Sequence, residues 1–208
     1  MASRGETRVI TTSIPDLWAW VAPDLGRRIV PFAASYLLIW SIFRPAWLGF
    51  SAGDLQAQLG FAAIAAPMGF LIAMFIRLRL ARTRGELVVP GSAPIAALEG
   101  AFYVVNGPVE EMFFRGLALG GMSLFIGMPI AFMIATSAYV LYHRLGNWSW
   151  TATAATAILG VPLGLAFWLL PGPPSILGVS IVHIATTCGF LGPGPYLVSR
   201  RLRATTKD

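Results

Sequence analysis

Six apolar runs, separated by turns and arginine-rich stretches, restrict what this sequence can fold into. A helix needs about 20 apolar residues to cross a bilayer, and a spanning segment must satisfy its own backbone hydrogen bonds. We therefore expect an all-α fold, a polytopic membrane helix bundle of about six transmembrane helices, with a range of about five to eight. The runs cover residues 29–43, 59–76, 95–122, 128–142, 151–170 and 175–198.

The composition agrees with a membrane protein. Hydrophobic residues make up 56% of the 208 residues and charged residues only 12%. A soluble core of this size does not need so much apolar surface. The single cysteine, Cys188, excludes an internal disulfide and a cysteine-based metal site. We find no cleavable export signal.

The apolar pattern divides the chain into three parts. Residues 1–28 carry two tryptophans near two arginines and are expected to form a cytoplasmic, interfacial segment. Residues 29–198 are expected to form the transmembrane helical domain, whose part 95–198 holds the polar motifs described below. Residues 199–208 form a basic cytoplasmic tail, and the proline- and glycine-rich stretch 85–94 predicts a loop.

The basic residues indicate the orientation of the chain in the membrane. If the N-terminus is cytoplasmic, every basic residue of the 15 except Arg44 and Arg115 falls on the cytoplasmic side. We therefore expect both termini in the cytoplasm, and the net charge of +6 requires no nucleic acid as a partner. The small size and the Ala- and Arg-rich composition, with a single Lys, favour a bacterial inner (plasma) membrane.

Three charged side chains interrupt the third apolar run. Glu111 and Arg115 are four residues apart and can pair on one helical face, whereas Glu110 lies about 100° round the axis. Glu110 is thus expected to lack a cationic partner, which suits a carboxyl group that exchanges a proton near neutral pH. Charged groups at bilayer depth are costly, so this cluster indicates a functional site.

Both histidines of the chain fall in later apolar runs. His143 follows Tyr139 by four residues, and His183 precedes Thr187 by four residues, so each can meet that neighbour on its own helix. A carboxylate and a neutral imidazole can activate water without a serine, a cysteine or a metal ion.

The order of these residues resembles the CAAX protease and bacteriocin-processing (CPBP) family. This family comprises glutamate-dependent intramembrane endopeptidases, among them the CAAX-processing endopeptidases of the endoplasmic reticulum. The resemblance covers roughly residues 95–189. Its motifs here are Glu110-Glu111-Met112-Phe113-Phe114-Arg115-Gly116, Tyr139-Val140-Leu141-Tyr142-His143 and His183-Ile184-Ala185-Thr186-Thr187, with Tyr139 where the family usually has Phe and Thr187 where it usually has Asn.

The resemblance implies a role for each motif residue. Glu110 and His143 would hold and deprotonate the attacking water, and Glu111 would brace the site as an ion pair with Arg115. His183 would donate a hydrogen bond to the oxyanion of the tetrahedral intermediate, and the residue four positions after it would help. That residue is a threonine, whose hydroxyl could instead bond to a carbonyl of its own helix.

A polar stripe extends the site along the third run. Glu99, Tyr103, Asn106 and Glu110 fall within about 40° of one helical face. We assign Asn106, Glu99 and Tyr139 to substrate-binding or supporting positions.

The sequence therefore predicts a metal-independent, glutamate-dependent endopeptidase that needs no cofactor. Its partners would be the lipid bilayer and a peptide or membrane-protein substrate, of the CAAX or leader type. The chain lacks the His-Glu-x-x-His pattern of metalloproteases and the second membrane aspartate of an aspartyl protease.

Two alternatives of other classes remain open. In the first, Glu110, Glu111, His143 and His183 bind a divalent cation, although the charge of Arg115 opposes this. In the second, the chain is a catalytically inactive CPBP-like protein with a bacteriocin-immunity or scaffolding role.

Overall fold

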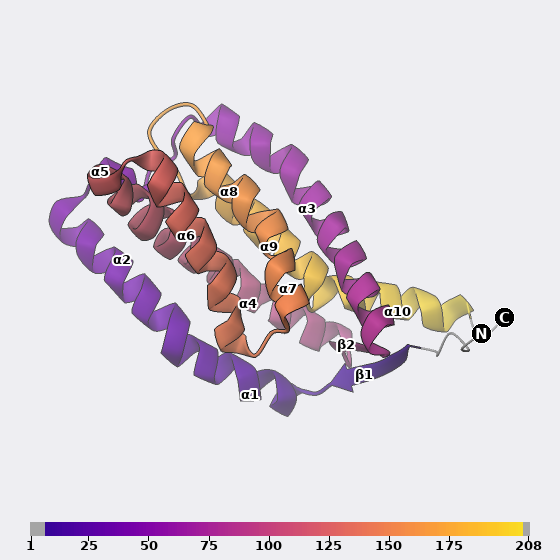
Figure 1. Ribbon diagram of the computed structural model, residues 1–208. Coiled ribbons are helices and arrows are strands. Elements are labelled where there is room, and N and C mark those ends of the chain that lie inside the picture. The colour runs from indigo at the N-terminus through magenta and orange to yellow at the C-terminus, as the bar shows by residue number, and fades with distance from the viewer. Residues whose placement is uncertain (1–6, 206–208) are drawn as a thin grey trace.

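The computed structural model describes residues 7–205 and contains six helical stretches that pack into a bundle (Figure 1). Each stretch corresponds to one of the six predicted apolar runs, so the predicted helical bundle is confirmed for this part of the chain. In chain order the stretches are α1 (Ile14–Asp24), η1 (Leu25–Ile29) and α2 (Val30–Phe43); α3 (Leu55–Arg84); α4 (Ala93–Glu111), η3 (Met112–Gly121) and α5 (Met122–Ile126); α6 (Met128–Tyr142) and η4 (His143–Gly146); α7 (Trp150–Ala155) and α8 (Ala157–Leu169); and α9 (Leu177–Phe190) and α10 (Pro193–Thr205).

Three of these stretches are long and apolar enough to cross a membrane, by their length and composition. They are Leu55–Arg84, Trp150–Leu169 and Leu177–Arg200. Large apolar side chains such as Ile64 and Leu71 are exposed on the outer face of α3. Such a face suits contact with lipid rather than with water.

Short polar residues and glycines mark where the helices begin and end. Ser13 caps α1 and exchanges hydrogen bonds with Asp16, and the Asp54 side chain caps α3. Gly85 ends α3 with φ of +73°, a conformation that side chains with a Cβ rarely adopt. A short helical turn, η2 (Ala46–Leu48), lies between α2 and α3.

Helical structure around the first apolar run begins before residue 29. It runs from Ile14 through the π-helical turn η1 into α2, so the preceding residues extend that run. At η1 the N–H of Leu25 still bonds to the carbonyl groups of the preceding turn. The arginines of this turn therefore lie on a helix that continues into the bundle.

The last apolar run contains a turn that was not predicted. Within the predicted run 175–198, α9 ends at Phe190, and Gly192 turns the chain with φ of +57° into α10. Lys207 of the predicted tail and Arg4 of the predicted N-terminal segment lie outside the described residues. The division into functional segments remains a prediction.

A two-stranded parallel sheet replaces part of the predicted loop. Strand β1 (Arg8–Thr12) pairs with β2 (Glu86–Pro90). Leu87 and Val89 alternate with exposed neighbours and pack toward Ala81 of α3. The period-two burial of these apolar residues explains the strand.

Small residues allow α3 and α9 to lie close together. A Cβ on Gly189 would stand 2.2 Å from the carbonyl oxygen of Phe70, and one on Gly178 would stand 2.8 Å from the carbonyl oxygen of Gln58. Membrane helices commonly pack through such positions, because backbones can approach where side chains are absent.

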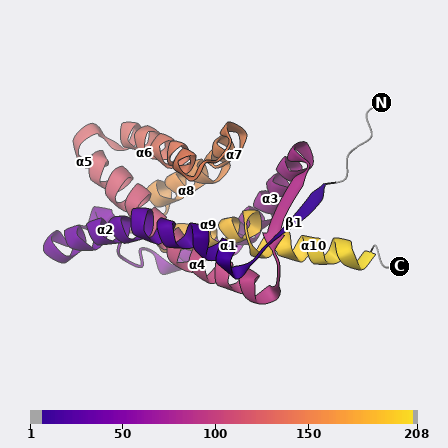
Figure 2. The same cartoon turned by 90° about the horizontal axis from the view of Figure 1, so that it is seen from below.

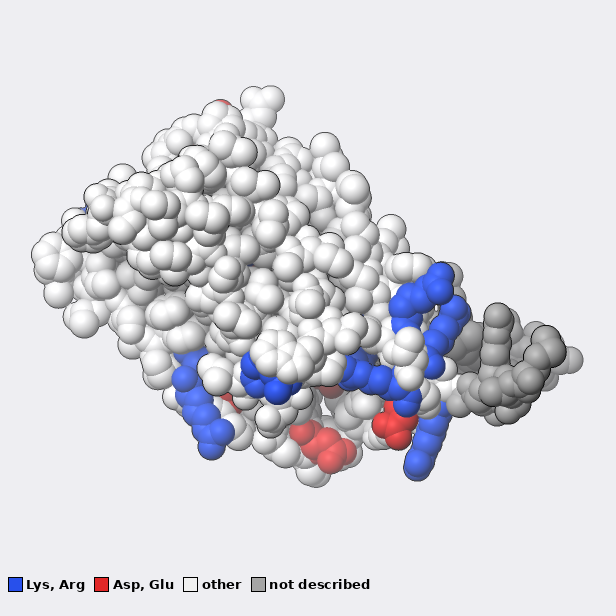
Figure 3. Space-filling view, viewed as in Figure 1, with Lys and Arg blue, Asp and Glu red and all other residues white. Residues whose placement is uncertain are grey.

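Basic side chains gather at one end of the bundle. Figures 1 and 2 show that β1, β2, α10 and the end of α3 lie together at this end. In Figure 3 the blue Arg side chains lie along the lower and right-hand edge, together with some acidic side chains, whereas the rest of the visible face is almost uncharged. This arrangement agrees with an orientation in which one end of the bundle faces the cytoplasm.

Close packing at Gly189 yields a test of the fold. We expect Gly189→Ala to lower the free energy of unfolding by about 1–3 kcal/mol, because the new methyl group meets backbone rather than a movable side chain. Gly60→Ala on α3 is the control, since nothing lies within 4 Å of its added Cβ. Thermal unfolding in detergent measures both, and equal transitions would contradict this packing.

Candidate active site

The polar motif residues converge inside the bundle from three helical stretches. Glu110 and Glu111 end α4, and Arg115 follows in η3. His143 begins η4 directly after α6, and His183 lies in α9. All except the partly buried His143 are at most 2% exposed.

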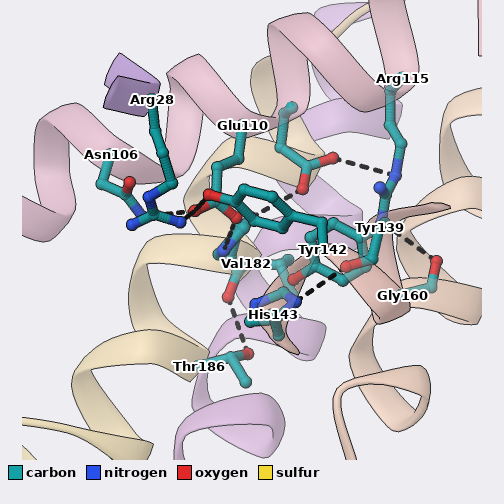
Figure 4. A network of polar contacts seen from close by, with 12 residues as sticks. Arg28, Asn106, Glu110, Arg115, Tyr139, Tyr142, His143, Gly160, Val182 and Thr186 are labelled. Carbon is teal, nitrogen blue, oxygen red and sulfur yellow. Dashed lines mark hydrogen bonds and ion pairs between the residues drawn. The ribbon is translucent and has the colours of Figure 1, made fainter. Parts of the chain in front are cut away.

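The carboxylate of Glu110 has two oxygens in different surroundings. Its Oε1 accepts hydrogen bonds from Asn106 Nδ2 at 3.0 Å, from the Tyr142 hydroxyl at 3.0 Å and from Arg28 Nη1 at 3.2 Å (Figure 4). Its Oε2 lies 3.6 Å from His183 Nε2 and has no hydrogen-bond partner among the described residues. One oxygen is therefore anchored, and the other is available to bind a small polar molecule.

Arg28 corrects the prediction for Glu110. Glu110 was expected to lack a cationic partner, but the Arg28 guanidinium reaches it from a helix 82 residues earlier in the chain. Arg28 also pairs with Asp24 on its own helix and lies over the Tyr142 ring, 4.9 Å from its centroid. Sequence reasoning missed Arg28 and Tyr142 as site residues. The available signals were the position of Arg28 at the start of an apolar run and of Tyr142 beside His143.

Glu111 connects the two other charged members of the site. Its Oε2 forms the expected ion pair with Arg115 Nε at 3.2 Å, and its Oε1 lies 2.7 Å from His183 Nδ1. Arg115 donates from Nη2 to the Gly160 carbonyl at 3.1 Å and lies over the Tyr139 ring, 4.4 Å from its centroid. The contact between Glu111 and His183, which joins α4 to α9, was not expected from the sequence.

His143 is oriented by its own helix. Its Nδ1 lies 2.8 Å from the Tyr139 carbonyl oxygen, so this nitrogen donates a hydrogen. In the neutral ring Nε2 is then a hydrogen-bond acceptor. The ring packs against Tyr142 and Trp148, with centroid separations of 5.2 and 5.0 Å.

Thr187 lines the same space, and its backbone carbonyl accepts a hydrogen bond from the N–H of Leu191 at 2.8 Å. The neighbouring hydroxyl of Thr186 donates to the Val182 carbonyl at 2.8 Å. The bond to the helix backbone that was considered for Thr187 is thus made by Thr186.

One cavity of about 920 Å³ is lined by Glu110, His143, His183 and Thr187, and the predicted polar stripe lines it too. Glu99, Tyr103 and Asn106 are buried and line this cavity along α4, and the Tyr103 hydroxyl lies 3.5 Å from Glu99 Oε2. The stripe keeps one face because α4 continues through Pro108. Strand residues Thr12 and Val89 line the cavity at the basic end of the bundle.

Helices able to span a membrane and a buried cluster of glutamate, histidine and arginine define an integral membrane protein with a polar site inside its bundle. The family model described as "Type II CAAX prenyl endopeptidase Rce1-like" matches residues 92–188. This match, which covers less than half of the chain, confirms the resemblance to CAAX endopeptidases over this segment. No curated protein and no solved structure matches the chain.

The matched segment contains the three motifs but not the whole site. Arg28 precedes it, and so does the part of α3 that lines the cavity. The site is therefore completed by residues outside the family match.

The buried ion pair yields a prediction for stability. We expect Arg115→Met to lower the free energy of unfolding by about 3–5 kcal/mol, because Glu111 keeps its charge in the core without this cation. Arg79→Met is the control, since Arg79 is exposed. Denaturant unfolding in mixed micelles measures both changes. A loss for Arg115→Met no larger than that for the control would contradict a stabilising role of the pair.

Proposed function

We propose that this protein is a CAAX-type intramembrane endopeptidase that hydrolyses a peptide bond with water activated by Glu110 and His143. The observation that carries the proposal is Glu110 Oε2, a buried carboxylate oxygen with no hydrogen-bond partner among the described residues, 3.6 Å from Nε2 of His183. A water bound there would meet a proton acceptor in a cavity large enough for a peptide.

The orientation of Glu110 supports this role. Its three donors fix Oε1, so Oε2 is held in one direction, and fixed geometry lowers the entropic cost of reaching the transition state. The water oxygen would form a bond to the carbonyl carbon of the peptide while its proton moves to Glu110 or His143. Return of that proton to the leaving amine would accompany cleavage of the C–N bond.

The remaining motif residues support the charge changes of this reaction. His183 is held by Glu111 at Nδ1 and, when protonated, can donate from Nε2 to the oxyanion. Thr187 lines the same cavity and could donate through its hydroxyl. Arg115 balances the charge of Glu111, and Tyr139 packs between Arg115 and His183.

The polar stripe would contact the substrate or support the acid. Asn106 donates directly to Glu110, which makes it a positioning residue. Glu99 lies further along the cavity and would meet another part of the peptide. The substrate would be a peptide or membrane-protein segment of the CAAX or leader type, presented from the bilayer.

The two alternatives lack comparable support. A divalent cation would have to compete with Arg28 and Arg115, which already neighbour the two carboxylates. No group of three His, Cys, Asp or Glu side chains is placed to hold a metal ion within residues 7–205. A silent immunity or scaffolding role would rest only on Thr187, where the family usually has Asn.

Proteolysis of a quenched fluorescent peptide in detergent tests the proposal. We expect Glu110→Gln to lower kcat by about 10²–10⁴-fold, because the amide cannot accept the proton. Glu86→Gln, on the exposed side of β2, should leave kcat unchanged. Activity that a chelator removes would favour the metal site, and full activity of Glu110→Gln would refute the proposed acid.

We also propose that the protein lies in a bacterial inner membrane with both termini in the cytoplasm. The basic end of the bundle supports this orientation (Figure 3). In a Cys188→Ser background, Thr83→Cys should react with an impermeant maleimide in inverted vesicles and Ser51→Cys in right-side-out vesicles. Both parent residues are exposed at opposite ends of α3. Labelling with the opposite sidedness would contradict this topology.

A further inference from the structure

One face of α3 lines the cavity with an apolar stripe that ends in a cation. Gly69, Ile72, Ala73, Ile76 and Arg77 all line the cavity and follow the i, i+3, i+4, i+7, i+8 spacing of one helical face. We call these five residues the α3 stripe. They lie outside the segment that matches the family.

The stripe begins beside the proposed catalytic groups. A Cβ on Gly69 would stand 2.3 Å from Thr186 Oγ1 and 3.8 Å from a methyl group of Val182, the residue before His183. The absence of a side chain at Gly69 therefore lets α3 pack closely against α9 at this end of the stripe. The other end of the stripe lies toward the basic end of the bundle, since α3 ends there.

Arg77 is a cation without an ion-pair partner among residues 7–205. Its Nε is buried and makes no hydrogen bond with the described residues. Its guanidinium lies over the Phe190 ring, 5.7 Å from the centroid. Glu99 is a buried acid that lines the same cavity, but its neighbour is the Tyr103 hydroxyl and not Arg77. A half-buried guanidinium whose Nε has no carboxylate partner among the described residues is suited to bind one from a ligand.

The other cations at the cavity are less suited to this task. Arg28 is already shared between Asp24 and Glu110. Arg27 is exposed, so water screens its charge. Of these three cations, Arg77 is therefore the one best placed to bind an anion from a ligand.

The distance between Arg77 and the site matches a short peptide. His183 and Phe190 are seven residues apart on α9, which corresponds to roughly 10 Å along the helix axis. Three extended residues also span roughly 10 Å. A peptide whose C-terminal carboxylate bound Arg77 would thus place the bond three residues from its end near Glu110 and His183.

We infer that Arg77 binds the C-terminal carboxylate of the peptide substrate, and that Ile72, Ala73 and Ile76 contact the apolar residues before it. This inference rests on the proposed endopeptidase function. A C-a-a-X tail has two aliphatic residues and a free carboxylate after its cysteine, which agrees with an apolar stripe that ends in a cation. Arg77 would then be a specificity-determining residue that distinguishes a chain terminus from an internal segment.

Matched peptides test the inference. The probe is a quenched fluorescent peptide that ends in S-farnesyl-cysteine followed by Val-Ile-Met, made either as the free acid or as the C-terminal amide. We expect the unaltered protein to cleave the acid with a kcat/KM at least tenfold above that for the amide. In Arg77→Gln this ratio should fall to near one. Arg79→Gln, an exposed arginine on the same helix, should keep the original ratio.

The ratio separates failure of the inference from failure of the proposed function. Equal cleavage of acid and amide by the unaltered protein, or an unchanged ratio in Arg77→Gln, would overturn the role of Arg77 while the endopeptidase function stands. No cleavage of either peptide by the unaltered protein would refute both. Loss of both activities in Glu110→Gln with a retained ratio in Arg79→Gln is the result expected if both proposals hold.

A charge reversal provides a second measurement that does not depend on loss of activity. Arg77→Glu should prefer a peptide with a cationic aminoethyl amide at its C-terminus over the free acid, the opposite of the unaltered protein. An Arg77→Glu variant that still prefers the acid would overturn the inference.

Discussion

Two adjacent acidic side chains, Glu110 and Glu111, are buried on one helix. The rest of the structure depends on how their negative charges are compensated. An isolated carboxylate in a low-dielectric core is very costly, whereas a carboxylate with cationic and hydrogen-bonding partners is tolerated. Arg115, on the next turn, forms an ion pair with Glu111, and Arg28, on the N-terminal helix, forms one with Glu110. The two pairs differ in burial. Arg115 is almost fully enclosed, whereas the Arg28 side chain is 25% exposed and lines the cavity.

This division assigns different properties to two adjacent acids. Glu111 is enclosed by Arg115 and His183, so its position ties α4 to α9. Glu110 is held through one oxygen only, and its second oxygen faces the cavity wall at His183. We propose that this asymmetry separates a bracing acid from a reacting acid. The N-terminal helix takes part in it through Arg28, although the family match begins only at residue 92.

The local features of this protein could be predicted from the sequence, and the long-range ones could not. The six helical stretches follow from apolar runs, and the contact between Glu111 and Arg115 follows from a spacing of four residues. Arg28 and Glu110 are 82 residues apart in the chain, and their contact depends on how their two helices pack. The periodicity of a sequence carries no information on such packing. The predicted loop after residue 85 was wrong in part for a related reason, because pairing between β1 and β2, which are distant in sequence, orders it as a strand.

The account depends on a water molecule between the free oxygen of Glu110 and an imidazole acceptor. An experimental structure in a lipid environment, at a resolution that shows ordered water, tests this most directly. The account predicts a water within hydrogen-bond distance of both Glu110 Oε2 and His143 Nε2, with Arg28, Asn106 and Tyr142 still on Oε1. The account would be contradicted if the side chains of Glu110 and His143 pointed away from each other. It would also be contradicted if a protein group bonded directly to Glu110 Oε2 and left no place for a water there.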